Sequence, residues 1–195
     1  DAPASPPETL RALRGPLSAI TLFTLGNSTD AFLLLRAGTL GVSVTQLPLL
    51  WALLHLVKSV TSAPGGALSD RVGRVPLVVS GWLLYAALYA GFAFAHAWWH
   101  AWALFAAYGV VFGLTEGAEK ALVADLAPPT ARGRAFGWYH LAIGVAALPA
   151  SVVFGAVWTR WTASTAFLMG SVLAVLASLV LVGSAQRAGG ALSSA

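Results

Sequence analysis

Ionisable side chains lie inside stretches of sequence that are otherwise apolar. Those that could take part in chemistry include Asp30, His55, Lys58, Glu116, Glu119 and Lys120. A charge inside a lipid bilayer is costly, so it normally faces other helices or a water-filled cavity. A carboxyl group in such a place loses solvation, which favours its protonated form and allows it to bind and release a proton. An acid and a lysine at the same depth would instead form an ion pair, so the elements that carry these groups decide their chemistry.

The composition indicates a membrane protein. The 195-residue chain is 58% hydrophobic and 9% charged, with a mean hydropathy of +0.78. Soluble globular domains carry roughly a quarter charged residues. The chain has no cysteine, which excludes disulfides, cysteine zinc sites and thiol nucleophiles. The net charge of +4 comes without a basic run, so we expect no nucleic-acid partner.

Six mainly apolar stretches have the length of about 20 residues that a membrane-spanning helix needs. They are residues 17–38, 45–64, 76–96, 101–125, 134–157 and 164–184. We therefore expect an all-α membrane protein in which residues 17–184 form a six-helix transmembrane unit. The Pro-rich segment 1–16 is typical of a linker, and residues 185–195 would form a tail.

Positive charges near the ends of the spans predict that both termini are cytoplasmic. The arginines expected on that side are Arg11, Arg14, Arg71, Arg74, Arg132, Arg134 and Arg187. Only Arg36 and Arg160 fall on the other side. There the sequence HAWWHAW (96–102) is typical of an interfacial aromatic belt. His96 and His100 have a spacing that could bind a metal on a helix, but we expect interfacial side chains and predict no metal.

Polar groups are concentrated in three of the six spans. The first has Thr21, Thr24, Asn27, Ser28 and Asp30; the second has His55, Lys58, Ser59 and Ser62; the fourth has Thr115, Glu116, Glu119 and Lys120, with Asp125 at its inner end. The third and sixth spans carry no charge. We expect the first and fourth spans to line a cavity, the second to line it in part, and the third and sixth to be outer supports.

Depth suggests partners for some of these charges. At about 1.5 Å per residue, Lys58 and Glu116 both lie roughly 20 Å below the outer surface and could pair across two helices. Glu116 also precedes Lys120 by four residues, which favours a pair within one helix.

We expect the deeper acids Asp30 and Glu116 to be functional and to share a substrate or ion pathway with Asn27, His55 and Lys58. Asn27 could instead bridge helices, and His55 could be a hydrogen-bonded packing residue. The favoured interpretation of Glu119, Lys120 and Asp125 is structural pairing or snorkelling near the inner surface, and the alternative is transport chemistry. These three and Arg132 are predicted to be supporting charges.

The fifth span has a pattern of its own. Gly137 and Gly144 lie seven residues apart with His140 between them, which would allow a close helix approach on one face. Pro149 is expected to bend this helix about halfway across the membrane.

The stretch GGALSDRVGRVP (65–76) forms the expected cytoplasmic joint between the second and third spans. Its glycines allow tight backbone geometry, and Pro76 suits the first turn of a helix. Asp70 is placed to cap that region, while Arg71 and Arg74 can reach lipid phosphates or carboxylates such as Asp125. We predict a charged clasp between helix ends.

Residues 66–74 resemble the G-x-L-x-D-R-x-G-R signature of the major facilitator superfamily, which lies in this joint of each six-helix half. The matching residues, to which the resemblance assigns the clasp, are Gly66, Asp70, Arg71, Gly73 and Arg74. The family often has a further basic residue where Val75 and Pro76 stand here, which weakens the clasp. The resemblance implies half of a major-facilitator-type bundle, built from two inverted three-helix repeats. Residues 66–71 and 155–160 then align as copies on opposite membrane sides.

Residues 116–137 resemble the fourth-to-fifth joint of bacterial efflux-type members, and the Pro-rich start resembles their central linker. The resemblance implies the C-terminal half of a secondary active transporter, and an efflux antiporter of the bacterial inner membrane. Its partners would be an N-terminal six-helix half, the lipid bilayer, a small-molecule substrate and protons, with no cofactor. The sequence has no G-x-x-x-x-G-K-[ST] motif, so coupling to an ion gradient is expected.

Two other classes stay open. A membrane-embedded enzyme would need a converging nucleophile or metal set, and no such set stands out at one depth. A non-transporting scaffold or receptor would leave Asp30 and Glu116 without an obvious use.

Overall fold

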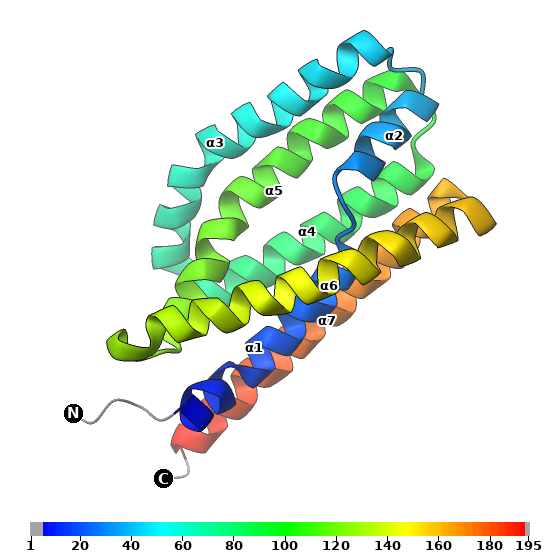
Figure 1. Cartoon of the computed structure of the whole chain (residues 1–195). Coiled ribbons are helices and arrows are strands. Elements are labelled where there is room, and N and C mark those ends of the chain that lie inside the picture. Colours follow the sequence, from blue (N-terminus) through cyan, green and yellow to red (C-terminus); the bar gives the residue numbers. More distant parts are fainter. Residues whose placement is uncertain (1–5, 194–195) are drawn as a thin grey trace.

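The computed structural model describes residues 6–193, which form a bundle of helices (Figure 1). The elements are α1 (Pro6–Gly26), α2 (Ala31–Thr39), the short η1 (Val44–Gln46), α3 (Leu47–Val72), α4 (Arg74–Phe94), α5 (Trp98–Asp125), the short η2 (Pro129–Ala131), α6 (Arg132–Arg160) and α7 (Ala163–Ser193). Within the described chain, six helical segments are long and apolar enough to cross a membrane, with α1 and α2 sharing the first. The expected all-α fold with six spans is confirmed.

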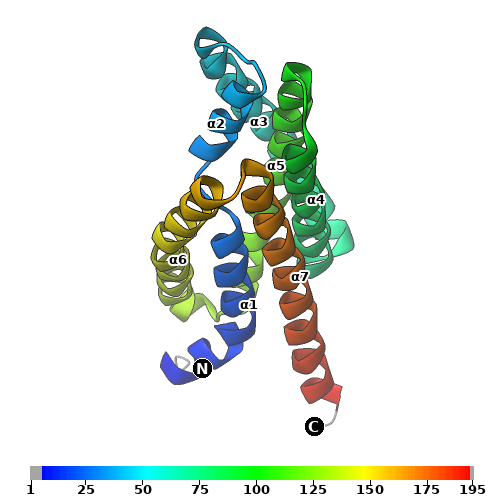
Figure 2. The same ribbon diagram turned by 90° about the vertical axis from the view of Figure 1, so that its right-hand side faces the viewer.

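The helices pack in a pattern that separates lining elements from supports. α5 packs against α3 and α4, and α7 packs against α4 and α1, while α6 lies beside α1. The start of α1 and the end of α7 lie at one end of the bundle, together with the α3–α4 and α5–α6 connections (Figures 1 and 2). We call this end the base and the opposite end the top.

The first span is broken, where one continuous helix had been expected. α1 ends at Gly26 and α2 begins at Ala31, with Asn-Ser-Thr-Asp between them. Side chains of these four types compete for backbone hydrogen bonds and disfavour a helix interior. Asn27 and Asp30 therefore lie at the ends of two helical segments rather than one turn apart on a single face.

The first helix also begins earlier than expected. α1 starts at Pro6, and the first span starts at Leu13 instead of residue 17. Most of the segment interpreted as a linker (1–16) is thus helical from Pro6 on, while residues 1–5 lie outside the described part. At the other end, α7 continues to Ser193, through most of the predicted tail (185–195).

The joint between α3 and α4 is shorter than the sequence suggested. α3 continues through Pro64 to Val72, and Gly73 alone connects it to α4, with a φ of 92°. That conformation favours glycine. Asp70 consequently lies in the last turn of α3 and does not cap α4, whose N-cap is Gly73. The prediction of an Asp70 cap was wrong because the helix runs on past it.

Gly65 lies within α3, where it allows a close contact with α5, and it is not part of the turn between α3 and α4. A Cβ added to Gly65 would lie 2.7 Å from the carbonyl oxygen of Gly113 in α5. Gly109 and Gly113 of α5 approach the backbone of α3 equally closely. A Cβ added to Gly109 would lie 2.7 Å from the Leu54 carbonyl oxygen, and one added to Gly113 would lie 2.7 Å from the Lys58 carbonyl oxygen. Small residues at four-residue spacing allow such close approach of helices in membranes.

The core of the bundle is aromatic. Its largest fully buried rings come mainly from α4 and α5: Trp82, Tyr85, Tyr89, Phe92, Phe105 and Tyr108. The Trp82 ring stacks on Phe23 of α1 with a centroid distance of 4.6 Å. α4, the uncharged third span, is the most buried of the six described spans. It therefore packs against the other helices as an outer support, as expected.

Two side chains organise the top of the bundle. Arg36 of α2 donates hydrogen bonds to the carbonyl oxygens of Phe92 at 3.0 Å and Ala95 at 2.9 Å. These are carbonyls at the end of α4 that have no partner within their own helix. His100 Nδ1 accepts hydrogen bonds from the backbone N–H groups of His96 and Ala97 at the start of α5. The His100 side chain therefore caps the start of α5. In the part of the chain that the structure describes, no group of three metal-ligating side chains occurs.

Candidate functional site

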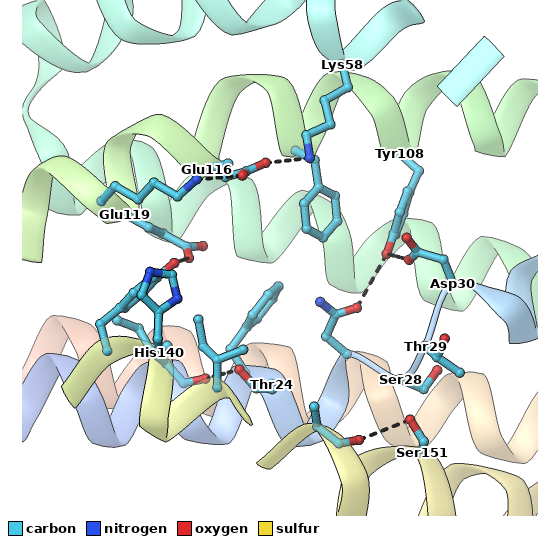
Figure 3. Close-up of a pocket in the computed structure, with 18 of the residues that line it drawn as sticks. Thr24, Ser28, Thr29, Asp30, Lys58, Tyr108, Glu116, Glu119, His140 and Ser151 are labelled. Atoms are coloured by element: carbon cyan, nitrogen blue, oxygen red, sulfur yellow. Dashed lines mark hydrogen bonds and ion pairs between the residues drawn. The ribbon is translucent and has the colours of Figure 1, made fainter. Parts of the chain in front are cut away.

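A cavity of about 580 Å³, lined by both apolar and charged side chains, lies between the helices (Figure 3). Its lining residues come from α1, the break after it, α3, α5 and α6, and none comes from α4 or α7. The first, second and fourth spans line the cavity as expected. The fifth span lines it as well, which the charge distribution could not reveal.

Glu116 lies at the centre of a three-residue ion-pair cluster. Lys58 Nζ of α3 lies 2.5 Å from Glu116 Oε2, and Lys120 Nζ lies 2.8 Å from Glu116 Oε1. Both predicted pairs are confirmed, and they form at the same time. The ammonium group of Lys58 also lies 5.9 Å from the centre of the Phe112 ring. Both lysines of the cavity therefore neutralise one carboxylate.

Tyrosine hydroxyls hold the break in the first span. Tyr108 donates to Asp30 Oδ1 at 2.8 Å, and its hydroxyl lies 3.4 Å from Asn27 Oδ1. Tyr85 lies 3.2 Å from the same Asn27 oxygen. Ser28 Oγ, beside them, is buried without a hydrogen-bond partner. Asn27 thus bridges helices, as one of its two interpretations held, while it also lines the cavity.

Glu119 does not occupy the place that the sequence suggested. Its carboxylate accepts a hydrogen bond from Trp82 Nε1 at 2.8 Å, and the Tyr139 hydroxyl lies 3.5 Å away. It lines the cavity one turn from Glu116, and forms no ion pair with the residues whose side chains the structure describes. The expected structural pairing near the inner surface is wrong for Glu119, because neighbouring helices supply neutral donors and no cation.

The fifth span contributes side chains that were not predicted for the site. Tyr139, His140 and Ser151 of α6 line the cavity together with Tyr108 of α5. A Cβ added to Gly137 or Gly144 would meet nothing within 4 Å. The close helix approach expected at these glycines is therefore not made within the described chain. His55 lines the cavity too, and its ring packs edge-on against Trp51 at 4.9 Å.

The predicted clasp is present at the base, with Arg74 at its centre. Arg74 bonds to Asp70 Oδ1 at 2.5 Å, Asp125 Oδ2 at 3.3 Å and Ser69 Oγ at 2.9 Å. It joins the end of α3, the start of α4 and the end of α5. Arg71, Arg132 and Arg134 are exposed at this end, as is Gly66. Arg160, in the aligned inverted copy, is exposed at the top.

The described residues form a six-span bundle with several charged side chains around an inner cavity, which is the arrangement of a multi-pass membrane protein with a polar interior site. The sequence profile of the Major Facilitator Superfamily matches residues 17–191, and the chain belongs to that superfamily. The chain is accordingly a multi-pass membrane protein with a half-bundle of the family fold.

Two relatives share clear sequence similarity. An uncharacterized MFS-type transporter of Methanocaldococcus jannaschii is 34% identical over 167 residues, which cover 83% of this chain and 42% of that protein. The multidrug resistance protein MdtH of Cronobacter sakazakii is 34% identical over 98 residues, covering 50% of this chain and 24% of that protein. The chain thus spans less than half the length of either relative.

Solved structures agree on the fold. A mutant of the peptide transporter POT, in complex with sulfate, superposes with a TM-score of 0.71 and 20% identity, over 86% of this chain and 37% of that one. A bacterial homolog of the human lysosomal transporter Spinster, in an inward-facing and unoccupied conformation, superposes with a TM-score of 0.68 and 15% identity. The match covers 93% of this chain and 44% of that one. Both structures likewise extend well beyond the region that this chain covers.

Proposed function

We propose that the chain is the C-terminal half of a secondary active transporter that moves a small molecule by alternating access. The observation that carries this proposal is the central cavity, with its charged groups contributed by the first, second and fourth spans. Scaffold proteins have no need for such costly groups inside a membrane. The proposed partner is an N-terminal six-helix half in the same polypeptide, and both termini of this half would be cytoplasmic.

We further propose that transport is coupled to protons, with Glu116 as the preferred carrier and Asp30 as the second candidate. Lys58 and Glu116 belong to different helices, whereas Lys120 and Glu116 share α5. A displacement of α3 relative to α5 would therefore remove Lys58 from Glu116 but leave Lys120 in place. Glu116 would then lose half of its neutralising partners and could take up a proton on Oε2, the oxygen that Lys58 leaves.

Efflux across the bacterial inner membrane is the proposed direction and location. The support is the relative named as a multidrug resistance protein and the resemblance of residues 116–137 to efflux-type joints. The same resemblance supports exchange of substrate against protons.

The direct test uses the full-length protein in proteoliposomes with an internal pH-sensitive dye. A transporter should release or take up protons when a transported compound is added, and should accumulate that compound only when a proton gradient is imposed. Accumulation without any ion gradient would contradict secondary active transport. Chemical conversion of the compound would favour the membrane-embedded enzyme, and binding without movement would favour the receptor.

A further inference from the structure

The described lining of the cavity has more carboxylates than cations. Its acidic residues are Asp30, Glu116 and Glu119, and its cationic residues are Lys58 and Lys120. Both lysines pair with Glu116. Asp30 and Glu119 are therefore left with hydroxyl and N–H partners only (Figure 3). A carboxylate in a membrane-embedded site is costly without a positive partner.

Neighbouring helices hold Glu119 in a fixed position. Trp82 Nε1 of α4 donates to Oε1, while the Tyr139 hydroxyl of α6 approaches Oε2. Trp82 is itself fully buried and stacked on Phe23, so the indole N–H cannot swing away. These donors orient the carboxylate without neutralising its charge.

Aromatic rings also line the cavity. They are Phe23, Tyr108, Phe112 and Tyr139. Of these, Tyr139 approaches Glu119 directly, and Phe23 stacks on Trp82, which binds Glu119. The face of an aromatic ring attracts a cation, and it also packs against an apolar body. A fixed carboxylate in a cavity with such rings fits a ligand that combines a positive charge with apolar groups.

The anionic side of the cavity also has an unused hydrogen-bonding group. Ser28 lines the cavity beside Asp30, is 3% exposed, and its Oγ has no hydrogen-bond partner. A buried hydroxyl in this state is unfavourable unless a ligand or water completes it. The described lining thus has one more carboxylate than cations, and a buried hydroxyl without a hydrogen-bond partner lies beside Asp30.

We propose that the cargo carries a positive charge and that Glu119 is the residue that recognises it, with Phe23 and Phe112 against its apolar part. This inference rests on the proposed transport function and names the substrate class of the same cavity. Glu119 selects for charge, while the Lys58–Glu116–Lys120 cluster keeps the neighbouring carboxylate occupied and unavailable to the cargo.

The test compares two probes of the same shape and opposite charge, tetraphenylphosphonium and tetraphenylborate. Their binding to the purified full-length protein is measured by equilibrium dialysis, which requires no transport. The native protein should bind the phosphonium at least about tenfold more tightly than the borate. Glu119→Gln, which keeps the shape and an acceptor for Trp82, should weaken phosphonium binding about ten- to a hundredfold and leave borate binding unchanged or stronger.

Glu119→Asp provides the matched control, because it retains the charge and should retain most of the preference for the phosphonium. Equal binding of the two probes by the native protein, binding of neither probe, or a preference that survives Glu119→Gln would overturn the proposal. An equal loss of both probes in Glu119→Gln would also overturn it, since that pattern indicates a structural role. Cation-selective binding without any transport in proteoliposomes would sustain this site and reject the proposed function instead.

Discussion

At the scale of single residues, the three acids of the cavity differ in the groups that their carboxyl oxygens contact. Glu116 has two lysines, Asp30 has a tyrosine hydroxyl, and Glu119 has an indole N–H with a second tyrosine nearby. The same side-chain chemistry can therefore perform different tasks within one cavity. A substitution that removes the charge while keeping the shape separates these tasks.

Glu116→Gln should abolish proton-driven net transport in the full-length protein while substrate exchange persists. Glutamine can still accept a hydrogen bond from Lys58 or Lys120, but it cannot bind and release a proton. Net uptake and counterflow in proteoliposomes measure the two activities separately. Asp30→Asn is the matched control at the other candidate carboxyl. If proton-driven transport is intact in Glu116→Gln and lost in Asp30→Asn, the carrier is Asp30.

At the scale of helices, the clasp at the base should control conformational change and not binding. Asp70→Asn and Arg74→Ala remove contacts between the ends of α3, α4 and α5, and none of the residues in these contacts lines the cavity. Arg74→Ala removes both ion pairs of the clasp and should lower turnover by roughly tenfold, while Asp70→Asn removes one pair and should lower it less. The substrate affinity should change little, because the clasp biases the equilibrium between states.

Steady-state transport kinetics of the two clasp variants give turnover and affinity in one experiment. Arg134→Ala is the matched control, since it removes one exposed arginine from the same end of the bundle without touching the clasp. A large loss of affinity at normal turnover in Arg74→Ala would contradict the assignment. So would an equal effect of Arg134→Ala.

The contact between α3 and α5 should depend on Gly113. An added Cβ would lie 1.9 Å from Thr61 Oγ1 and 2.7 Å from the Lys58 carbonyl oxygen. The backbone carbonyl cannot move aside, so Gly113→Ala should destabilise the protein by about 1–3 kcal/mol. Gly117→Ala, one turn further along α5, meets nothing within 4 Å and should not destabilise it. Thermal unfolding in detergent measures both variants, and equal midpoints would refute close packing at Gly113.

The sequence predicted the spans well but not every feature inside them. Hydropathy and the distribution of charges were sufficient for the six spans and for the pairing of Glu116 with both lysines. The break at residues 27–30 has a local signal in its Asn-Ser-Thr-Asp run, but Tyr85 and Tyr108, which hold it, reach it from other helices, and local sequence could not reveal those contacts. Glu119 was misplaced for the same reason, because Trp82 lies in a span without charge. The spacing of Gly109 and Gly113 was a readable signal of close helix packing.

At the scale of the whole molecule, two of the helices that line the cavity leave apolar faces uncovered by the described chain. α3 and α6 are the spans least buried within this chain. The exposed faces of these helices are apolar, with side chains such as Leu56, Val60, Leu148 and Val152 at 63–76% exposure. Lys58 and Lys120 also line a second hollow of about 630 Å³ next to the cavity. A second six-helix unit placed against α3 and α6 would cover these faces and both hollows.

The 195-residue chain alone should therefore insert into a membrane but should not transport. Its six apolar spans satisfy their backbone hydrogen bonds internally, so insertion needs no second half. Alternating access requires that the cavity open to one side at a time, and a half-bundle cannot seal either side by itself. Counterflow in proteoliposomes, together with the mass of the protein–detergent complex, measures activity and oligomeric state in the same preparation. Saturable transport by a monomer would overturn this expectation. Activity confined to a dimer would show that two copies can close the cavity, which is the behaviour of a half-size transporter.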